Sequence, residues 1–168
     1  KKIAQFMRCE CEDGTPFHHI HATGSFGWRW MPDYVKEQGV DLAAHPALDM
    51  REYIYDMPQV LAAAELIICR AGAATIAEVC ASGTPCIMVP SPNVTGNHQE
   101  KNARVLERSG AAAVVREADC DGKSLYETAK SILSDAGRMR AMRASARDMA
   151  VVDAAERIYQ TALDLAKH

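Results

Sequence analysis

Long apolar runs are absent from this chain of 168 residues. No stretch approaches the roughly 20 consecutive apolar residues that a helix needs to cross a bilayer, and we expect no secretory signal at its start. A strong net charge is also absent, because 19 basic and 22 acidic residues leave a net charge of −3. No overall positive field therefore attracts nucleic acid. With 48% hydrophobic and 24% charged residues, the composition indicates one globular domain with a buried core.

Cysteine pairs with the C-x-x-C spacing of a zinc site are absent as well. The six cysteines are Cys9, Cys11, Cys69, Cys80, Cys86 and Cys120. Two of them, Cys69 and Cys86, lie inside apolar runs, where cysteine behaves as a small buried hydrophobic residue. We therefore expect free thiols in a reducing cytoplasm, with neither a disulfide framework nor a metal.

Histidine is concentrated at His18, His19 and His21. On a strand, His19 and His21 would share a face, as a pair of metal ligands requires. No carboxylate or cysteine follows at ligand spacing. We therefore favour a structural role for this cluster over a metal site.

Short apolar runs alternate with helical patterns along the chain. Buried strands that are separated by helices indicate an α/β fold, with a doubly wound parallel sheet covered on both faces. We expect strands at residues 18–23, 40–44, 66–69, 86–89 and 112–115. We expect helices at residues 1–8, 28–38, 58–64, 74–81 and 98–109. The tail beyond these elements is helical, with breaks at 134–137 and 151–153.

The segment after the strand at 66–69 contains the first candidate binding residues, because ligands of such sheets bind beyond the carboxyl ends of the strands. Gly72 allows a ligand to approach the backbone, and the N–H groups that open the next helix suit a diphosphate. Glu78 could accept hydrogen bonds from a ribose diol. An alternative remains open, because Thr75-x-x-Glu78 also matches a capping box that only satisfies helix-end donors.

A second candidate segment, Asn97-His98-Gln99, follows the strand at 86–89 and enters the next helix. Amides pair well with sugar hydroxyls because they both donate and accept hydrogen bonds. The alternative is that Asn97 caps the helix while His98 and Gln99 face solvent.

Together these segments resemble the C-terminal domain of the MurG glycosyltransferases, and they follow in the same order along nearly the whole chain. They are Asp56-Met57, Ala64 to Glu78, Gly83-Thr-Pro85, Val89-Pro90, Asn97-His98-Gln99, Asn102-Ala103, Gly110-Ala-Ala and Asp153 to Ile158. The resemblance implies the Rossmann-like C-terminal half of a GT-B glycosyltransferase. Residues 1–168 would form its donor-binding domain with the C-terminal helices. In the family this half opens with a strand that ends in Gly-Gly-Ser, so we expect the first strand to be lacking here.

The resemblance also implies a donor site in this chain. Its members are Ile54, Arg70, Gly72, Ala73, Ala74, Thr75, Glu78, His98 and Gln99. In the family, the residue at Glu78 holds the donor ribose and the backbone at Ile54 reads the uracil edge. The positions from Ala73 to Thr75 line the diphosphate, and those of His98 and Gln99 face the sugar. Some relatives carry glutamine where this chain has His98. Arg70 could neutralise phosphate or be structural.

The implied activity is an inverting transfer of GlcNAc from UDP-GlcNAc to an undecaprenyl-diphosphate-linked muramoyl peptide in peptidoglycan synthesis. The resemblance implies no cofactor and no metal. The acceptor site and the catalytic base belong to the family's N-terminal half, so no catalytic residue is expected here and we expect this chain to be inactive alone. The intact enzyme would lie peripherally on the inner, cytoplasmic face of the cell membrane, without a nucleic-acid partner.

Two other functions remain open at this point. The chain could be a nucleotide-sugar-binding subunit that needs a separate acceptor-binding chain. It could also be a UDP-sugar epimerase of the same fold, which would need extra catalytic carboxylates and histidines in both halves.

Overall fold

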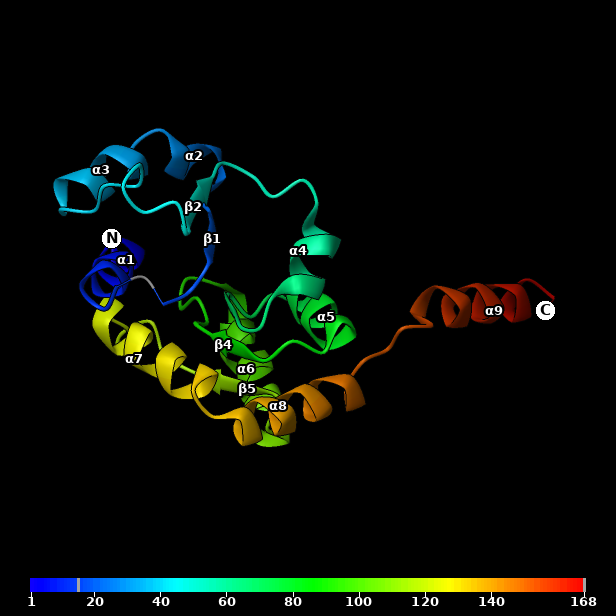
Figure 1. Cartoon of the computed structure of the whole chain (residues 1–168). Helices are drawn as coiled ribbons and strands as arrows, with labels where there is room; N and C mark the ends of the chain where they lie inside the picture. Colours follow the sequence, from blue (N-terminus) through cyan, green and yellow to red (C-terminus); the bar gives the residue numbers. More distant parts are fainter. Residues whose placement is uncertain (15, 168) are drawn as a thin grey trace.

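The computed structural model of the protein describes residues 1–14 and 16–167, so that Thr15 and His168 lie outside the described residues. Parallel strands are surrounded by helices (Figure 1), which confirms the predicted α/β fold. The first elements along the chain are α1 (Lys2–Glu12), β1 (His19–Ala22), α2 (Gly24–Trp28), α3 (Met31–Glu37) and β2 (Leu48–Arg51).

The later elements alternate more regularly. They are α4 (Met57–Ala63), β3 (Ile67–Cys69), α5 (Ala73–Ser82), β4 (Cys86–Met88), the 3₁₀ turn η1 (Thr95–Asn97), α6 (His98–Ser109) and β5 (Ala112–Val114). Three helices follow, α7 (Gly122–Leu133), α8 (Ala136–Asp148) and α9 (Ala154–Ala166). Most expected elements are therefore present, with bounds shifted by a few residues.

The strands form two parallel sheets instead of one. β1 pairs with β2, starting with His19 opposite Leu48, while β3, β4 and β5 pair in that order. A cavity of about 900 Å³ lies between the sheets and is lined by residues of both, including His21 from β1 and Cys69 from β3. A doubly wound sheet that lacks its central strand has this arrangement. The edges of β1 and β3 that face the cavity are therefore unpaired among the described strands.

Two expected elements were wrong in detail. Residues 40–44 are not a strand, because the chain turns there: Ala43 N–H donates to the Asp41 carboxylate at 3.0 Å and Ala44 N–H donates to the Asp41 carbonyl at 3.1 Å. Aspartate favours this kind of turn, and the strand forms later as β2. The helix expected at 28–38 begins later, as α3 at Met31, and the separate short helix α2 precedes it. Pro32 lies in the first turn of α3, where a missing N–H costs nothing.

β4 separates two parts of the hydrophobic core. Ile87 packs with residues of α1 and α7, among them Phe6 and Leu125. Cys86 and Met88 point to the opposite face and pack with residues of α5 and α6. Alternate residues of a strand face opposite sides, so helices cover both faces of this sheet, as doubly wound folds require.

α1 and α7 approach each other closely at Gly122. A Cβ atom at this position would lie 2.5 Å from Gln5 Cβ and 2.7 Å from Phe6 N. Gly122 N–H also donates to Gln5 Oε1 at 2.9 Å. At the other end of this contact, the Tyr126 hydroxyl donates to the Asp13 carboxylate at 2.6 Å. These contacts hold α1 against α7.

β1 is joined to α1 through a buried polar pair. His19 Nδ1 lies 2.7 Å from Glu10 Oε2, and the Glu10 side chain is fully buried. Glu10 Oε1 has no hydrogen-bond partner among the described residues. Part of the histidine cluster therefore contributes a contact between β1 and α1.

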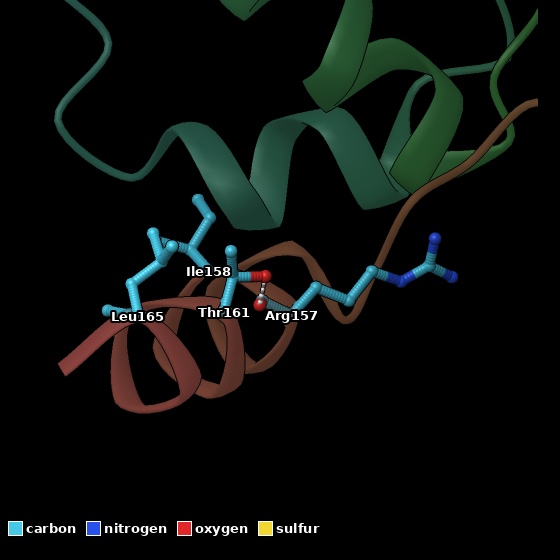
Figure 2. A pocket seen from close by; sticks show the side chains of 5 residues that line it. Arg157, Ile158, Thr161 and Leu165 are labelled. Carbon is cyan, nitrogen blue, oxygen red and sulfur yellow. Dashed lines mark hydrogen bonds between the residues drawn. The ribbon is translucent and has the colours of Figure 1, made fainter. Parts of the chain in front are cut away.

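α9 extends away from the other elements (Figure 1), and every residue described in it is exposed. Ile158, Thr161 and Leu165 line a shallow hollow along this helix, while the Arg157 side chain points away from them (Figure 2). Within residues 1–14 and 16–167, no helix is long and apolar enough to cross a membrane.

Candidate functional site

The segments that follow β3 and β4 are brought together by a side-chain hydrogen bond. Asn102 Nδ2, on α6, donates to the carbonyl of Ala71 at 3.2 Å. Ala71 is fully buried and precedes the start of α5. The two segments that the sequence singled out therefore lie side by side at the carboxyl ends of neighbouring parallel strands.

α5 begins with free backbone donors. Its N-cap is Gly72, which makes no side-chain hydrogen bond to the helix, and the first helical bond runs from Ile76 N–H to the Gly72 carbonyl at 3.0 Å. The N–H groups of the first three helical residues, Ala73 to Thr75, thus have no hydrogen-bond partner within the described part of the chain. Such donors, with the positive end of the helix dipole, attract anions.

The position of this N-terminus also tests the capping-box interpretation of Thr75 and Glu78. A capping box requires Thr75 to be the N-cap, but that residue is Gly72 and Thr75 lies three residues into the helix. The capping-box alternative is therefore wrong. The exposed Glu78 carboxylate has no hydrogen-bond or ion-pair partner among residues 1–14 and 16–167, so it can accept hydrogen bonds from a ligand.

Ile54 lies in the connection between β2 and α4, where no regular structure uses its backbone. Neither its N–H nor its carbonyl makes a backbone hydrogen bond with any described residue. The neighbouring Tyr53 lines the cavity between the sheets, and its hydroxyl accepts a hydrogen bond from Ser25 N–H at 3.4 Å. The Ile54 peptide groups can therefore pair with the edge of a base.

His98 and Gln99 each use one polar side-chain atom in a contact with the protein and leave another polar atom without a partner among the described residues. His98 Nδ1 lies 3.0 Å from the Thr95 carbonyl, which only accepts, so Nδ1 carries a proton and Nε2 is left for another partner. Gln99 Oε1 accepts from Ser91 N–H at 2.9 Å, which leaves the amide NH₂ group as a donor. The structural role of Gln99 in the loop was not foreseen. Asn97 is the N-cap of α6 but makes no side-chain capping bond.

Arg70 leaves the end of β3 and is held by a residue that the sequence did not indicate. Its Nη1 donates to the Val89 carbonyl at 3.0 Å and also to Glu117 Oε2. Lys2 Nζ donates to Glu117 Oε1 at 2.9 Å. The hydrogen bond from Lys2, together with the one from Arg70, lowers the pKa of Glu117 below its ordinary value against the opposing effect of burial. All three side chains line the cavity.

His21 is a further cavity residue that sequence reasoning did not assign to the site. Burial lowers its pKa to about 4, helped by the charge of the neighbouring His19. Its ring is therefore neutral near pH 7. It presents one donor and one acceptor nitrogen on the β1 side of the cavity.

A sequence model described as the glycosyltransferase family 28 C-terminal domain matches residues 1–158. The chain belongs to glycosyltransferase family 28, as its C-terminal domain. This assignment confirms the domain type that the motifs predicted.

Curated relatives agree with the family assignment. A UDP-N-acetylglucosamine--N-acetylmuramyl-(pentapeptide) pyrophosphoryl-undecaprenol N-acetylglucosamine transferase from Salinibacter ruber is 45% identical over 147 residues, which are 88% of this chain and 38% of the relative. A transferase of the same name from Acetivibrio thermocellus is 39% identical over 152 residues, 90% of this chain and 40% of the relative. The family 28 domain described here thus spans about two fifths of the length of these relatives.

Solved structures of similar fold include MurG from Acinetobacter baumannii, with a TM-score of 0.69 and 27% identity over 84% of this chain and 40% of that one. The predicted resemblance to MurG is thereby confirmed. The calicheamicin glycosyltransferase CalG4 has a TM-score of 0.65 at 20% identity, covering 99% of this chain and 41% of that one, which shows a shared fold alone.

Proposed function

We propose that this chain, residues 1–168, is the UDP-GlcNAc-binding domain of an inverting transferase that adds GlcNAc to an undecaprenyl-diphosphate-linked muramoyl peptide. The observation that carries this proposal is the start of α5, where uncapped N–H groups and the unpaired Glu78 carboxylate lie within two turns of one helix. The names of the family 28 relatives, which are N-acetylglucosamine transferases, support the choice of donor and acceptor.

In this proposal the diphosphate lies against the N-terminus of α5. The N–H groups of Ala73, Ala74 and Thr75 donate to its oxygens, and Gly72 lets the ligand approach the backbone. Arg70 supplies a full positive charge from the end of β3. Glu78 accepts hydrogen bonds from the ribose hydroxyls, because a carboxylate oxygen can accept from both members of a diol.

The two ends of the donor would be recognised by different loops. The unpaired peptide groups of Ile54 bind the uracil edge, which presents both a donor and acceptors. His98, through Nε2, and the amide NH₂ of Gln99 bind hydroxyls of the GlcNAc ring. These residues bring little charge to the site, which suits an uncharged sugar.

The reaction needs little covalent chemistry from this domain. The acceptor hydroxyl loses its proton to a base of another part of the protein, and its oxygen forms a bond to the anomeric carbon. The bond from that carbon to the diphosphate breaks, and UDP leaves with the electron pair. Helix N–H groups and Arg70 stabilise the charge that develops on UDP, which is where preorganised donors accelerate such a step.

The lipid-linked acceptor places the proposed reaction at a membrane. We therefore propose that the intact protein works peripherally at the cytoplasmic face of the cell membrane, with its acceptor bound by residues outside this chain.

Binding of UDP-GlcNAc to the full-length protein tests the proposal by calorimetry. We expect Glu78→Ala to weaken binding by roughly ten- to a hundredfold, because a hydrogen bond to a charged group contributes about 1.5–3 kcal/mol. Glu127→Ala is the matched control, since Glu127 is also an exposed helical glutamate but lies on α7 instead of α5. Equal affinities of the wild type and Glu78→Ala would contradict the proposed role of Glu78.

Turnover assays separate the proposed activity from its two alternatives. The transferase requires both UDP-GlcNAc and a lipid-linked acceptor. An epimerase would convert UDP-GlcNAc without any acceptor. A binding subunit would show turnover only after addition of a second chain.

A further inference from the structure

Arg70, Glu117 and Lys2 form a charged cluster on the wall of the cavity between the sheets. They come from three distant parts of the chain: the end of β3, the segment after β5 and the start of α1. The Glu117 side chain is 30% exposed and receives bonds from both cations. Lys2 Nζ also donates to the Glu117 backbone carbonyl at 2.6 Å, so Lys2 holds Glu117 through both its side chain and its main chain.

The way Arg70 is bound leaves most of its guanidinium group free. Both of its recorded hydrogen bonds, to the Val89 carbonyl and to Glu117, start from Nη1. Nε and Nη2 have no partner among the described residues. Because the Arg70 side chain is 52% exposed, a ligand can reach these two nitrogens. These two nitrogens form the side-on edge of the guanidinium, whose parallel N–H groups match two oxygens of one phosphate.

We propose that Glu117 is a positioning residue, which holds Arg70 through Nη1 so that the Nε and Nη2 edge can bind a phosphate group of a nucleoside diphosphate. This inference rests on the proposed donor site, and it adds a residue that no motif in the sequence marks. Glu117 sets the orientation of the Arg70 side chain, and the Val89 carbonyl holds the guanidinium group against the cavity wall. Without the carboxylate, a long arginine side chain samples many rotamers, and ordering it would reduce the affinity.

The charge of the cluster fits this role. Two cations and one carboxylate leave one net positive charge on this cluster. The lowered pKa of Glu117, held down first by the bond from Lys2, keeps the carboxylate ionised at neutral pH. Glu117 thus remains bound to Arg70 without cancelling the attraction of the cluster for an anion.

The test compares UDP with uridine, which lacks phosphate. In the full-length protein, we expect Glu117→Gln to weaken UDP binding by about five- to tenfold and to change uridine binding by less than about twofold. The matched control is Asp119→Asn. It removes one negative charge from the same loop, but Asp119 pairs with Arg116 and does not line the cavity. We expect the control to bind UDP within about twofold of the wild type.

A double-mutant cycle then asks whether Glu117 acts through Arg70. Arg70→Ala should weaken UDP binding, and adding Glu117→Gln to it should have no further effect. Four results would overturn the inference: unchanged or tighter UDP binding by Glu117→Gln, equal losses for UDP and uridine, an equal loss in Asp119→Asn, or an undiminished effect in the Arg70→Ala background. If the wild type failed to bind UDP at all, the proposed function itself would be overturned.

Discussion

The two sheets of this domain differ in how completely their strands are enclosed. β4, at the centre of the three-stranded sheet, is paired on both edges, and all three of its residues are buried. Among the described strands, β1 pairs only with β2, and none of its four residues is fully buried. The proposed diphosphate contacts follow β3, a half-buried strand that pairs with β4 along one edge, while Ile54 follows β2. In the proposed site, recognition of the phosphates therefore depends on a strand held by the buried β4, whereas recognition of the base depends on how α1 holds the smaller sheet.

The largest expected effect concerns the isolated chain, in which the edges of β1 and β3 face the cavity without a partner. We expect this chain to show no transferase turnover, because acid–base assistance and substrate alignment would come from outside it, and the former alone typically contributes 10²–10⁴-fold. We also expect self-association, since unpaired strand edges recruit other strands. Sedimentation analysis and an assay with UDP-GlcNAc and a lipid-linked acceptor measure both. A monodisperse, active 168-residue chain would contradict both expectations.

A second prediction tests the support that α1 gives to the smaller sheet. Gly122→Ala places a methyl group against Gln5 and the backbone of Phe6, so we expect a loss of about 3 kcal/mol in the free energy of unfolding. Denaturant unfolding of the full-length protein measures this loss. Gly137→Ala on α8 is the control: its Cβ would lie 3.3 Å from Oδ1 of the exposed Asp135 side chain, which can shift, and alanine favours a helix, so we expect a change of less than about 1 kcal/mol. Equal stabilities of the two variants would show that α1 does not depend on this contact.

The smallest expected effect concerns the sugar end of the site. We expect Gln99→Ala to reduce turnover of UDP-GlcNAc by about tenfold, while inhibition by UDP stays nearly unchanged because UDP lacks the sugar. Steady-state kinetics with UDP as a competing inhibitor give both values. The bond from Ser91 to Gln99 Oε1 supplies the competing explanation. If both values fell together, Gln99 would act by holding the loop and not by touching the sugar.

The local parts of this architecture were predictable from the sequence, and the long-range parts were not. The helix at α5 and its glycine N-terminus follow from a short run of small residues, so the position of the candidate phosphate site needed only local information. Glu117 reaches Arg70 across 47 positions of the chain, and no spacing pattern encodes such a contact. The strand expected at 40–44 failed for a local reason, because the turn favoured by Asp41 outweighed a short apolar run.

β4 also has a consequence for how this domain changes over evolutionary time. Its three residues connect two separate sets of helices, since Ile87 packs toward α1 and α7 while Cys86 and Met88 pack toward α5 and α6. A change in side-chain volume at Ile87 is compensated most readily by a change in α1 or α7, and one at its neighbours by a change in α5 or α6. Substitutions that accumulate together in homologous proteins should therefore fall into two groups. One group would include position 87, and the other would include positions 86 and 88.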